Sequence, residues 1–324
     1  MSEQRAFLGI DIGGTNVKIG AITEEGEILE QRSIPTNVHR PPEAVIADIA
    51  AAAAEIRTLV EARGRAACSL GVGIPGATDN VRGVCLLLPN FPNGWKGVRI
   101  REQLEAQLQL PAFLINDVRA ITLAEKLFGA GRTVSSMVMA AIGTGIGGGV
   151  VVNNELLFGK DGSAGEFGHI NVEPDGVLCG CGSRGCLECY ASGPAIAGAA
   201  LRALVQQNDT LIRDLVAKDY NKVTAAVVAQ AAEQGDRVAK EILATAGQYI
   251  GRAMAIVCVV VNPEMVVIGG GVAQAGHVLF DDICQAFRET LFMIPADTVQ
   301  LRLSELGVFA GIQGSAAWGM KNCQ

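Results

Sequence analysis

The stretch FLGIDIGGTNVKIGAI, residues 7–22, decides the fold because it joins two strand-like runs through a glycine turn. Residues 7–12 and 17–22 are rich in β-forming side chains, and residues 13–16 between them are typical of a hairpin turn. The pattern returns at residues 136–152, where SMVMAAI leads into GTGIGGG and then VVV. The repeat indicates a duplicated α/β unit that begins with a β-hairpin.

The remainder of the chain supplies helices and further strands for two such units. A helix is expected from about Pro42 to about Arg63, because proline favours the first turn and Gly64 follows the last. Further elements are expected as strands at 69–74, 84–88, 113–115 and 265–268, a mainly helical region up to Val261 and a last helix at 311–320. Two units without a Ser/Pro-rich linker predict two lobes that face each other across a cleft. Ligands should bind at the strand ends, where the glycine turns fall.

Composition describes a folded protein that does not bind nucleic acid. The 324 residues suffice for two domains, and 49% apolar against 18% charged residues argues against disorder. The net charge is -7 and no basic cluster stands out, so a nucleic-acid surface is not expected. An anionic ligand must therefore be held by backbone amides, a metal ion or a few side chains.

The same composition favours a cytoplasmic protein. The start of the chain lacks the basic segment and apolar core of a secretory signal. The most apolar run, residues 253–261, ends at Asn262-Pro-Glu264, short of the ~20 residues that a bilayer requires. No membrane span is therefore expected. Nine cysteines, an odd number, fit reduced thiols and a metal site better than a disulfide framework.

Two neighbouring motifs supply the ligands of a metal site. GEFGH, residues 165–169, contributes one imidazole, and CGCGSRGCLE, residues 179–188, contributes three thiols. Three thiolates and one neutral imidazole fill the four positions of a closed tetrahedral zinc site, so the metal is expected to be structural and not a Lewis acid. The predicted ligands are His169, Cys179, Cys181 and Cys186.

The alternative is that these cysteines are buried apolar thiols and that His169 belongs to the core. The spacing C-x-C-x4-C in a glycine-rich, charge-bearing turn offers no apolar face, which favours zinc. Cys189 is left out, because His169 already completes the ligand set. Glu166 and Glu188 flank the site without being needed by the metal, and we expect them to face a ligand rich in hydroxyls.

Three glycine turns at strand ends predict a phosphate site, because successive backbone N–H groups form an anion-binding concavity. The turns are residues 13–16, 143–149 and 269–271, and Asp11 before the first is placed to hold Mg²⁺ through water. The alternative for a single turn is a tight hairpin with no ligand; the three together favour a nucleotide. Residues 143–148 also spell G-x-G-x-x-G, but a β-branched run follows where a dinucleotide fold requires a helix.

Together these motifs resemble the ROK family of sugar kinases, repressors and open reading frames. The motifs that carry the resemblance are DIGGTN (11–16), GIPG (73–76), ND (116–117), GTGIGGG (143–149), GEFGH (165–169), CxCGxxGCxE (179–188) and IGGG (268–271). The match spans nearly the whole chain and is closest to the bacterial glucokinases of the family. It implies an ATP-dependent hexose kinase, most simply a glucokinase, with ATP and Mg²⁺ as phosphoryl donor, a structural Zn²⁺ and a homodimer.

The resemblance also implies a fold and a domain division. The fold would be the two-lobed, actin-like ATPase fold of the hexokinase type, which is ribonuclease H-like. A small α/β domain would comprise residues 1–117, completed by about 308–324. A large α/β domain of residues 118–307 would carry the zinc loop.

The resemblance gives each motif a role. Asp117 would be the general base that accepts the proton of a sugar hydroxyl, whereas capping of a helix is the alternative for an aspartate after a strand. Residues expected to bind the sugar are Gly76, Asn116, Asp117, Glu166, His169 and Glu188. Residues expected to bind the nucleotide and Mg²⁺ are Asp11, Gly13, Gly14, Thr15, Asn16, Gly143, Thr144, Gly145 and Gly270. His169 could serve twice, with one nitrogen on zinc and the other facing the sugar.

The chain departs from the family pattern at two places. After Asn116-Asp117 the family usually has Ala-Asn-Ala, whereas this chain has Val118-Arg119-Ala120. Arg119 is expected to turn away as a surface residue, or else to lower the pKa of the base and narrow the range of sugars. Gln313 stands where small residues are usual.

Two other functions are compatible with the motifs. A sugar-sensing repressor would need a DNA-binding head, and only about six residues precede the first expected strand. A kinase for N-acetylhexosamine, fructose, mannose or allose would keep every catalytic role and change only the rim of the sugar pocket. A donor other than ATP, such as polyphosphate, also stays open.

Overall fold

The computed structural model describes residues 4–88, 91–92 and 94–323 as two compact units. Unit 1 comprises Met1–Thr133, Glu155–Ala164 and Glu305–Gln324, and unit 2 comprises Val134–Asn154 and Gly165–Ser304. The first boundary lies after Thr133 and not after Asp117, because helix α3 (Asp117–Leu127) packs on helix α10 (Ala310–Asn322) inside unit 1. The short segment Glu155–Ala164 also returns to unit 1, which the sequence did not indicate.

The sheet of unit 1 has the strand order β3-β2-β1-β4-β7. Strands β1 and β2 form the antiparallel hairpin expected from residues 7–22, β3 extends it, and β4 and β7 add in parallel. The strands are β1 (Gln4–Ile12), β2 (Asn16–Ile22), β3 (Ile28–Pro35), β4 (Arg65–Ile74) and β7 (Ala112–Asn116). A separate small hairpin joins β5 (Ala77–Asp79) to β6 (Val84–Leu87).

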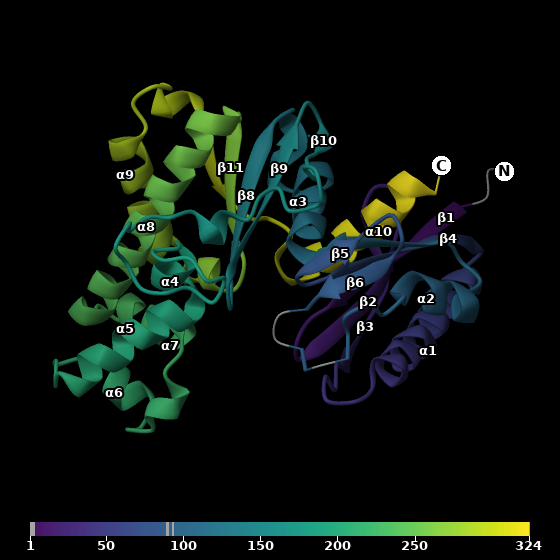
Figure 1. Ribbon diagram of the computed structural model, residues 1–324, viewed down its shortest axis with the longest axis horizontal. Helices are drawn as coiled ribbons and strands as arrows, with labels where there is room; N and C mark the ends of the chain where they lie inside the picture. The colour runs from purple at the N-terminus through teal and green to yellow at the C-terminus, as the bar shows by residue number, and fades with distance from the viewer. Residues whose placement is uncertain (1–3, 89–90, 93, 324) are drawn as a thin grey trace. The chain divides into compact units, whose positions relative to one another are not determined.

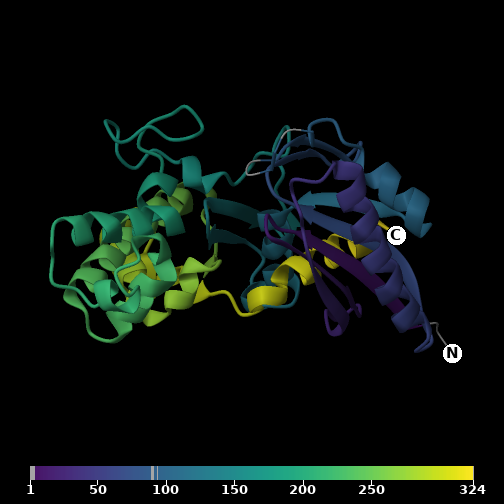
Figure 2. The same cartoon turned by 90° about the horizontal axis from the view of Figure 1, so that it is seen from below.

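Helices cover both faces of this sheet. Helix α1 (Pro42–Glu61) buries Val45, Ile46, Ile49 and Ile56, a spacing that forms one apolar stripe against the strands. Helix α2 (Ile100–Leu108) packs beside it, as Figures 1 and 2 show. Helices α3 and α10 pack together on the other face, across β1, β4 and β7. Strands β1 and β7 therefore belong to the same sheet of unit 1. The carboxyl end of each strand carries predicted site residues.

Unit 2 repeats the plan of unit 1. Its strands follow the order β9-β8-β11-β12, with an antiparallel hairpin followed by parallel strands, which matches β2-β1-β4-β7. The strands are β8 (Met137–Ile142), β9 (Ile146–Val152), β11 (Met265–Gly269) and β12 (Gln300–Leu303). The duplication expected from the repeated strand, glycine turn and strand is therefore confirmed. Strand β9 also confirms that G-x-G-x-x-G here does not open a helix.

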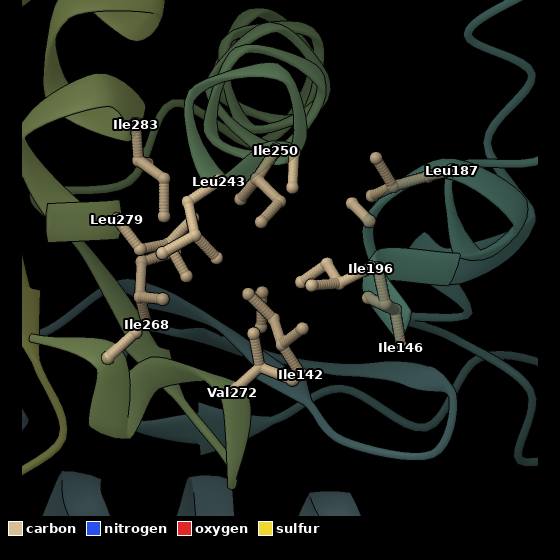
Figure 3. Close-up of a cluster of buried hydrophobic side chains, with 14 of the residues drawn as sticks. Ile142, Ile146, Leu187, Ile196, Leu243, Ile250, Ile268, Val272, Leu279 and Ile283 are labelled. Atoms are coloured by element: carbon tan, nitrogen blue, oxygen red, sulfur yellow. The ribbon is translucent and has the colours of Figure 1, made fainter. Parts of the chain in front are cut away.

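The core of unit 2 lies between this sheet and its helices (Figure 3). Ile142 and Ile268 of the strands face Leu243 and Ile250 of helix α8, and Ile196 joins them from helix α5. The main helices of unit 2 are α5 (Gly193–Val205), α7 (Ala225–Glu233), α8 (Arg237–Val261) and α9 (His277–Thr290).

Helix α8 is the one helix among the described residues that is long and apolar enough to cross a membrane by length and composition. Half of its most apolar part is buried inside unit 2, where α8 packs along α9 and α7. The helix ends where the sequence analysis placed the break, because Asn262 adopts a left-handed conformation with φ 49° and caps it. Its packing is that of a core helix.

Candidate active site

The first predicted nucleotide turn joins β1 to β2 at the end of the unit 1 hairpin. Gly13 N donates to Asn16 O at 3.0 Å and closes the turn. Thr36, a buried residue after β3, donates its Oγ1 proton to Gly13 O at 2.6 Å. The exposed residues of the turn are Gly14, Thr15 and Asn16. The turn is thus held from behind while its tip stays open to a ligand. Thr36 was missed, because nothing in the sequence links it to a turn 23 residues earlier.

Asn116, and not Asp117, caps the helix that starts at the end of β7. Asn116 Oδ1 accepts from Val118 N at 3.1 Å and from Arg119 N at 3.2 Å. Asn116 Nδ2 donates to Gly76 O at 3.1 Å, which brings the predicted sugar residues Gly76, Asn116 and Asp117 together in unit 1. The carboxylate of Asp117 accepts from Val118 N, the amide of the next residue, at 2.9 Å. The capping alternative for Asp117 is therefore not what the structure shows.

The environment of Asp117 favours its protonated form more than water does. Burial, and after it the negative charge of Asp11, raises the pKa of Asp117 from its ordinary value of 3.8 to about 6. The backbone N–H groups of Val118 and of Asp117 itself, and the Arg119 guanidinium, act in the opposite direction. Burial also raises the pKa of Asp11, and the positive charge of the nearby Lys18 opposes this rise. A carboxyl that titrates near pH 6 is suited to general-base catalysis at neutral pH.

Arg119 is buried, with 3% of its surface exposed, so the expectation of a surface residue was wrong. Its Nε and Nη2 groups donate to Ala164 O at 3.2 and 2.7 Å. Helix α3 turns this side chain inward because residue 119 lies on the face that packs inside unit 1. The other expectation, that Arg119 lowers the pKa of the base, agrees in direction with the structure. The second departure, Gln313, is also buried and donates Nε2 to Gly26 O at 2.9 Å.

The four predicted metal ligands converge in unit 2. The ligand atoms of His169, Cys179, Cys181 and Cys186 all lie within 4.8 Å of one another. Cys179 Sγ lies 3.8 Å from His169 Nδ1, and Cys181 Sγ lies 3.7 Å from Cys186 Sγ. Sulfur at about 2.3 Å and nitrogen at about 2.0–2.1 Å from a tetrahedral zinc would lie about 3.5–3.8 Å apart. The donor set therefore fits zinc.

Cys189 stands beside the cluster without belonging to it. It is not among the four converging residues, and burial raises the pKa of its thiol to about 11. The thiol of Cys179, in contrast, has its pKa lowered to about 7, chiefly by the backbone N–H of Cys181. The lowered pKa favours the thiolate of Cys179, which is the form that binds a metal.

The loop that carries the cluster is tied to helix α8. Tyr249 on α8 donates its hydroxyl proton to Glu173 Oε1 at 3.0 Å. Tyr190, whose ring centroid lies 4.8 Å from that of Tyr249, accepts Val177 N at 3.0 Å. Leu187 N, in the second predicted motif, donates at 2.9 Å to the carbonyl oxygen of Ile170, the residue directly after the first motif. These bonds hold His169 and the cysteines in one framework.

Glu188 connects this loop to the second glycine turn. Its Oε2 accepts Ile146 N at 3.0 Å, and Gly145 leaves room for the carboxylate, since a Cβ there would lie 2.3 Å from Oε2. Gly193 N donates to Gly143 O at 2.8 Å from the start of helix α5. Glu188 was predicted only as a sugar residue, so its hold on the turn was missed; the sequence carries no signal for it.

The remaining predicted residues of unit 2 lie around the same turn. Gly270, with φ 87°, approaches Ile142 so closely that a Cβ would lie 2.4 Å from its carbonyl oxygen. Glu166 and His169 stand at the two ends of a short 3-10 turn that packs on strand β9, and both are exposed. Because Nδ1 of His169 faces the cysteines, Nε2 is the nitrogen left for a ligand. The predicted residues thus form two groups, one in each unit.

The sequence profile of the ROK family matches residues 7–322. The chain belongs to the ROK family. A glucokinase of Thermotoga maritima is 37% identical to it over 311 residues, which cover 96% of each chain. A solved ROK glucokinase of Streptomyces griseus, in complex with glucose and AMPPNP, is 33% identical with a TM-score of 0.84 and covers 98% of this chain and 100% of that one.

ROK proteins that regulate transcription share the fold equally well. A solved ROK regulator, a homologue of the Escherichia coli MLC protein, is 29% identical with a TM-score of 0.86 and covers 97% of this chain and 78% of that one. The ROK relationship confirms the two-lobed, actin-like fold of the hexokinase type that the motifs implied. The fold alone does not distinguish a kinase from a transcriptional regulator. That distinction depends on the residues of the site.

Proposed function

We propose that this ROK protein is an ATP-dependent hexose kinase that converts D-glucose and ATP into glucose 6-phosphate and ADP. The observation that carries the proposal is the carboxyl of Asp117. It lies at the start of α3 beside Asp11, has a pKa raised to about 6, and leaves the capping of the helix to Asn116. The names of the relatives, glucokinases at 37% and 33% identity, support the substrate.

Asp117 would act as the general base on the 6-hydroxyl of the sugar. As that oxygen forms its bond to the γ-phosphorus, the bond from this phosphorus to the bridging oxygen of ADP breaks, and the hydroxyl proton passes to Asp117. A deprotonated carboxylate predominates above about pH 6. Asn116 fixes the backbone before the base by its bonds to α3 and to Gly76 O.

Glu166, Glu188 and His169 would select the sugar through its hydroxyls. Carboxylates accept hydrogen bonds from hydroxyl groups, and His169 has its Nε2 available while Nδ1 faces the cysteines. A zinc ion held by His169, Cys179, Cys181 and Cys186 would shape this loop and leave no open position for chemistry. Its contribution would be to the geometry of the sugar site.

The glycine turns would hold the donor. Backbone N–H groups at the tips of the Gly13 and Gly143 turns, with Gly270, would donate to the phosphates of ATP. Mg²⁺, when bound, would neutralise the charge that develops on the transferred group, with Asp11 behind it through water. The residues fit such an ion, because burial raises the pKa of Asp11 and a nearby cation would offset that cost.

Coupled assays over a sugar panel and a donor panel test the proposal. D-glucose with Mg·ATP should give the highest kcat/KM, and the panel should include mannose, fructose, allose and N-acetylhexosamines as acceptors and polyphosphate as donor. A higher kcat/KM with another hexose would keep the kinase and replace the substrate. No turnover with any pair, together with sugar-dependent binding to duplex DNA, would favour the regulator.

A further inference from the structure

Helix α3 carries three buried charged side chains, Arg119, Glu125 and Lys126, and the first two are the most deeply buried. Arg119 and Glu125 are 3% and 0% exposed. Both bind backbone groups of other segments of unit 1. A buried charge loses its contacts with water, and hydrogen bonds to polar groups must compensate for that loss. The bonds to these backbone groups provide that compensation.

The partners of both side chains lie at the points where the chain passes between the units. Ala164, whose carbonyl oxygen accepts two N–H groups of Arg119, is the last residue of its segment before Gly165 begins unit 2. Glu125 Oε1 accepts the N–H groups of Glu305 and Leu306, both at 3.0 Å, and Glu305 is the first residue after unit 2.

The carboxylate of Glu125 also holds the segment before another crossing, the one that follows Thr133. Glu125 Oε2 accepts Ala130 N at 2.9 Å, at the start of the short turn Ala130–Thr133 that precedes unit 2. The side chain of Arg132 in that turn also lies 3.6 Å from the carboxylate of Glu305. Three crossing segments are therefore fixed to one helix, and that helix begins with Asp117.

We propose that Arg119 and Glu125 are positioning residues. They hold three of the four segments by which the chain passes between the units on helix α3, which carries the proposed base. The proposal rests on the proposed function for its effect on turnover. Glu166, one of the proposed sugar residues, follows Ala164 by two positions along the chain, so loss of the Arg119 bond would release the segment that leads into it. A small misplacement of such a group lowers the rate even though it touches no reacting atom.

Hydrogen exchange of the full-length protein tests the anchoring directly. Glu125→Gln should speed exchange of the amides of Ala130, Glu305 and Leu306, and Arg119→Ala should speed exchange of the Ala164 amide. Arg101→Ala is the matched control, because Arg101 also donates to two carbonyl oxygens of another segment of unit 1, those of Asn80 and Val81. It should leave the four amides unchanged.

Kinetics test the consequence. Arg119→Ala should lower kcat/KM for glucose by about 10- to 100-fold, with Arg119→Lys intermediate and Arg101→Ala near wild type. The proposal would be overturned if Arg119→Ala matched Arg101→Ala in both its exchange rates and its kinetics. If Arg119→Ala does not fold, Arg119→Lys and Glu125→Gln carry the same test. If the wild type lacks kinase activity, the proposed function fails and the exchange rates alone decide the anchoring.

Discussion

At the scale of single residues, the chemistry depends on how differently two neighbouring side chains are used. Both polar groups of the Asn116 side chain make structural hydrogen bonds. Oδ1 accepts from the first turn of α3, and Nδ2 donates to Gly76 O. Asp117 keeps a carboxyl whose pKa is raised by burial and by Asp11. The sequence places these residues side by side, but only the fold shows which one caps the helix.

The pH dependence of turnover follows from the raised pKa of Asp117. The proposed base must be deprotonated, so kcat/KM for glucose should be level above about pH 7 and fall about tenfold per unit well below about pH 6. Initial rates from pH 4.5 to 8.5, with recovery of activity after return to pH 7.5 as the control, measure this. A profile that stays level down to pH 5 would mean that another group limits the reaction.

The same shift predicts a pH-dependent change in stability. Because the folded pKa lies above the ordinary 3.8, the protonated carboxyl contributes stability that is complete below about pH 4 and is lost as the pH rises through about 6. Asp117→Asn should therefore be more stable than wild type at pH 8, by up to about 2 kcal/mol, and no more stable at pH 4. Urea unfolding at both pH values gives the comparison. An equal difference at the two pH values would contradict the shift.

The two acids near the zinc loop should behave differently, because Glu188 also holds Ile146 N. Glu166→Gln should raise KM for glucose while KM for ATP stays near normal, since loss of a charge-assisted bond costs about 1.5–3 kcal/mol. Glu188→Gln should raise both KM values. Asp175→Asn, which changes an exposed acid of the same loop, is the control. If Glu166→Gln and Glu188→Gln changed KM for ATP equally, the bond from Ile146 N to Glu188 would have no effect on the binding of ATP.

At the scale of elements, the regular patterns were predictable and the long-range partners were not. Both hairpins, helix α1 and strand β11 follow from alternating or periodic apolar residues around glycine and proline. Strand β3 was missed because its exposed side chains include Gln31, Arg32 and Ser33, which do not resemble a strand core. Bonds such as Glu125 to Glu305 join residues 180 positions apart, and only the packed fold brings them together.

The loop with the predicted zinc ligands, residues 165–188, is the element in which sequence spacing predicted most of the arrangement. Ligands within one loop converge because few bonds separate them, and the four predicted residues do so. Cys186→Ser should lose both the metal, about one zinc per chain, and most of the kinase activity. Cys189→Ser, outside the set of four, should keep both. Full activity in a protein freed of metal would show that zinc does not shape the sugar site.

At the scale of the whole molecule, two units with the same strand order each supply part of the proposed machinery. Unit 1 carries the proposed base, Asp11 and the first glycine turn, and unit 2 carries the second turn and the residues proposed to bind the sugar. The family and the fold were predictable, because the motifs span nearly the whole chain. The choice between kinase and regulator depends on single residues, since a ROK regulator matches with a TM-score of 0.86.

The central claim is that Asp117 accepts the sugar proton in a glucokinase reaction. Steady-state turnover of Asp117→Asn with glucose and Mg·ATP tests it most directly, because asparagine keeps the shape and removes the proton acceptor. The account predicts a loss of about 10²–10⁴ in kcat, with KM for glucose and ATP changed much less. Turnover of Asp117→Asn close to that of the wild type would contradict it.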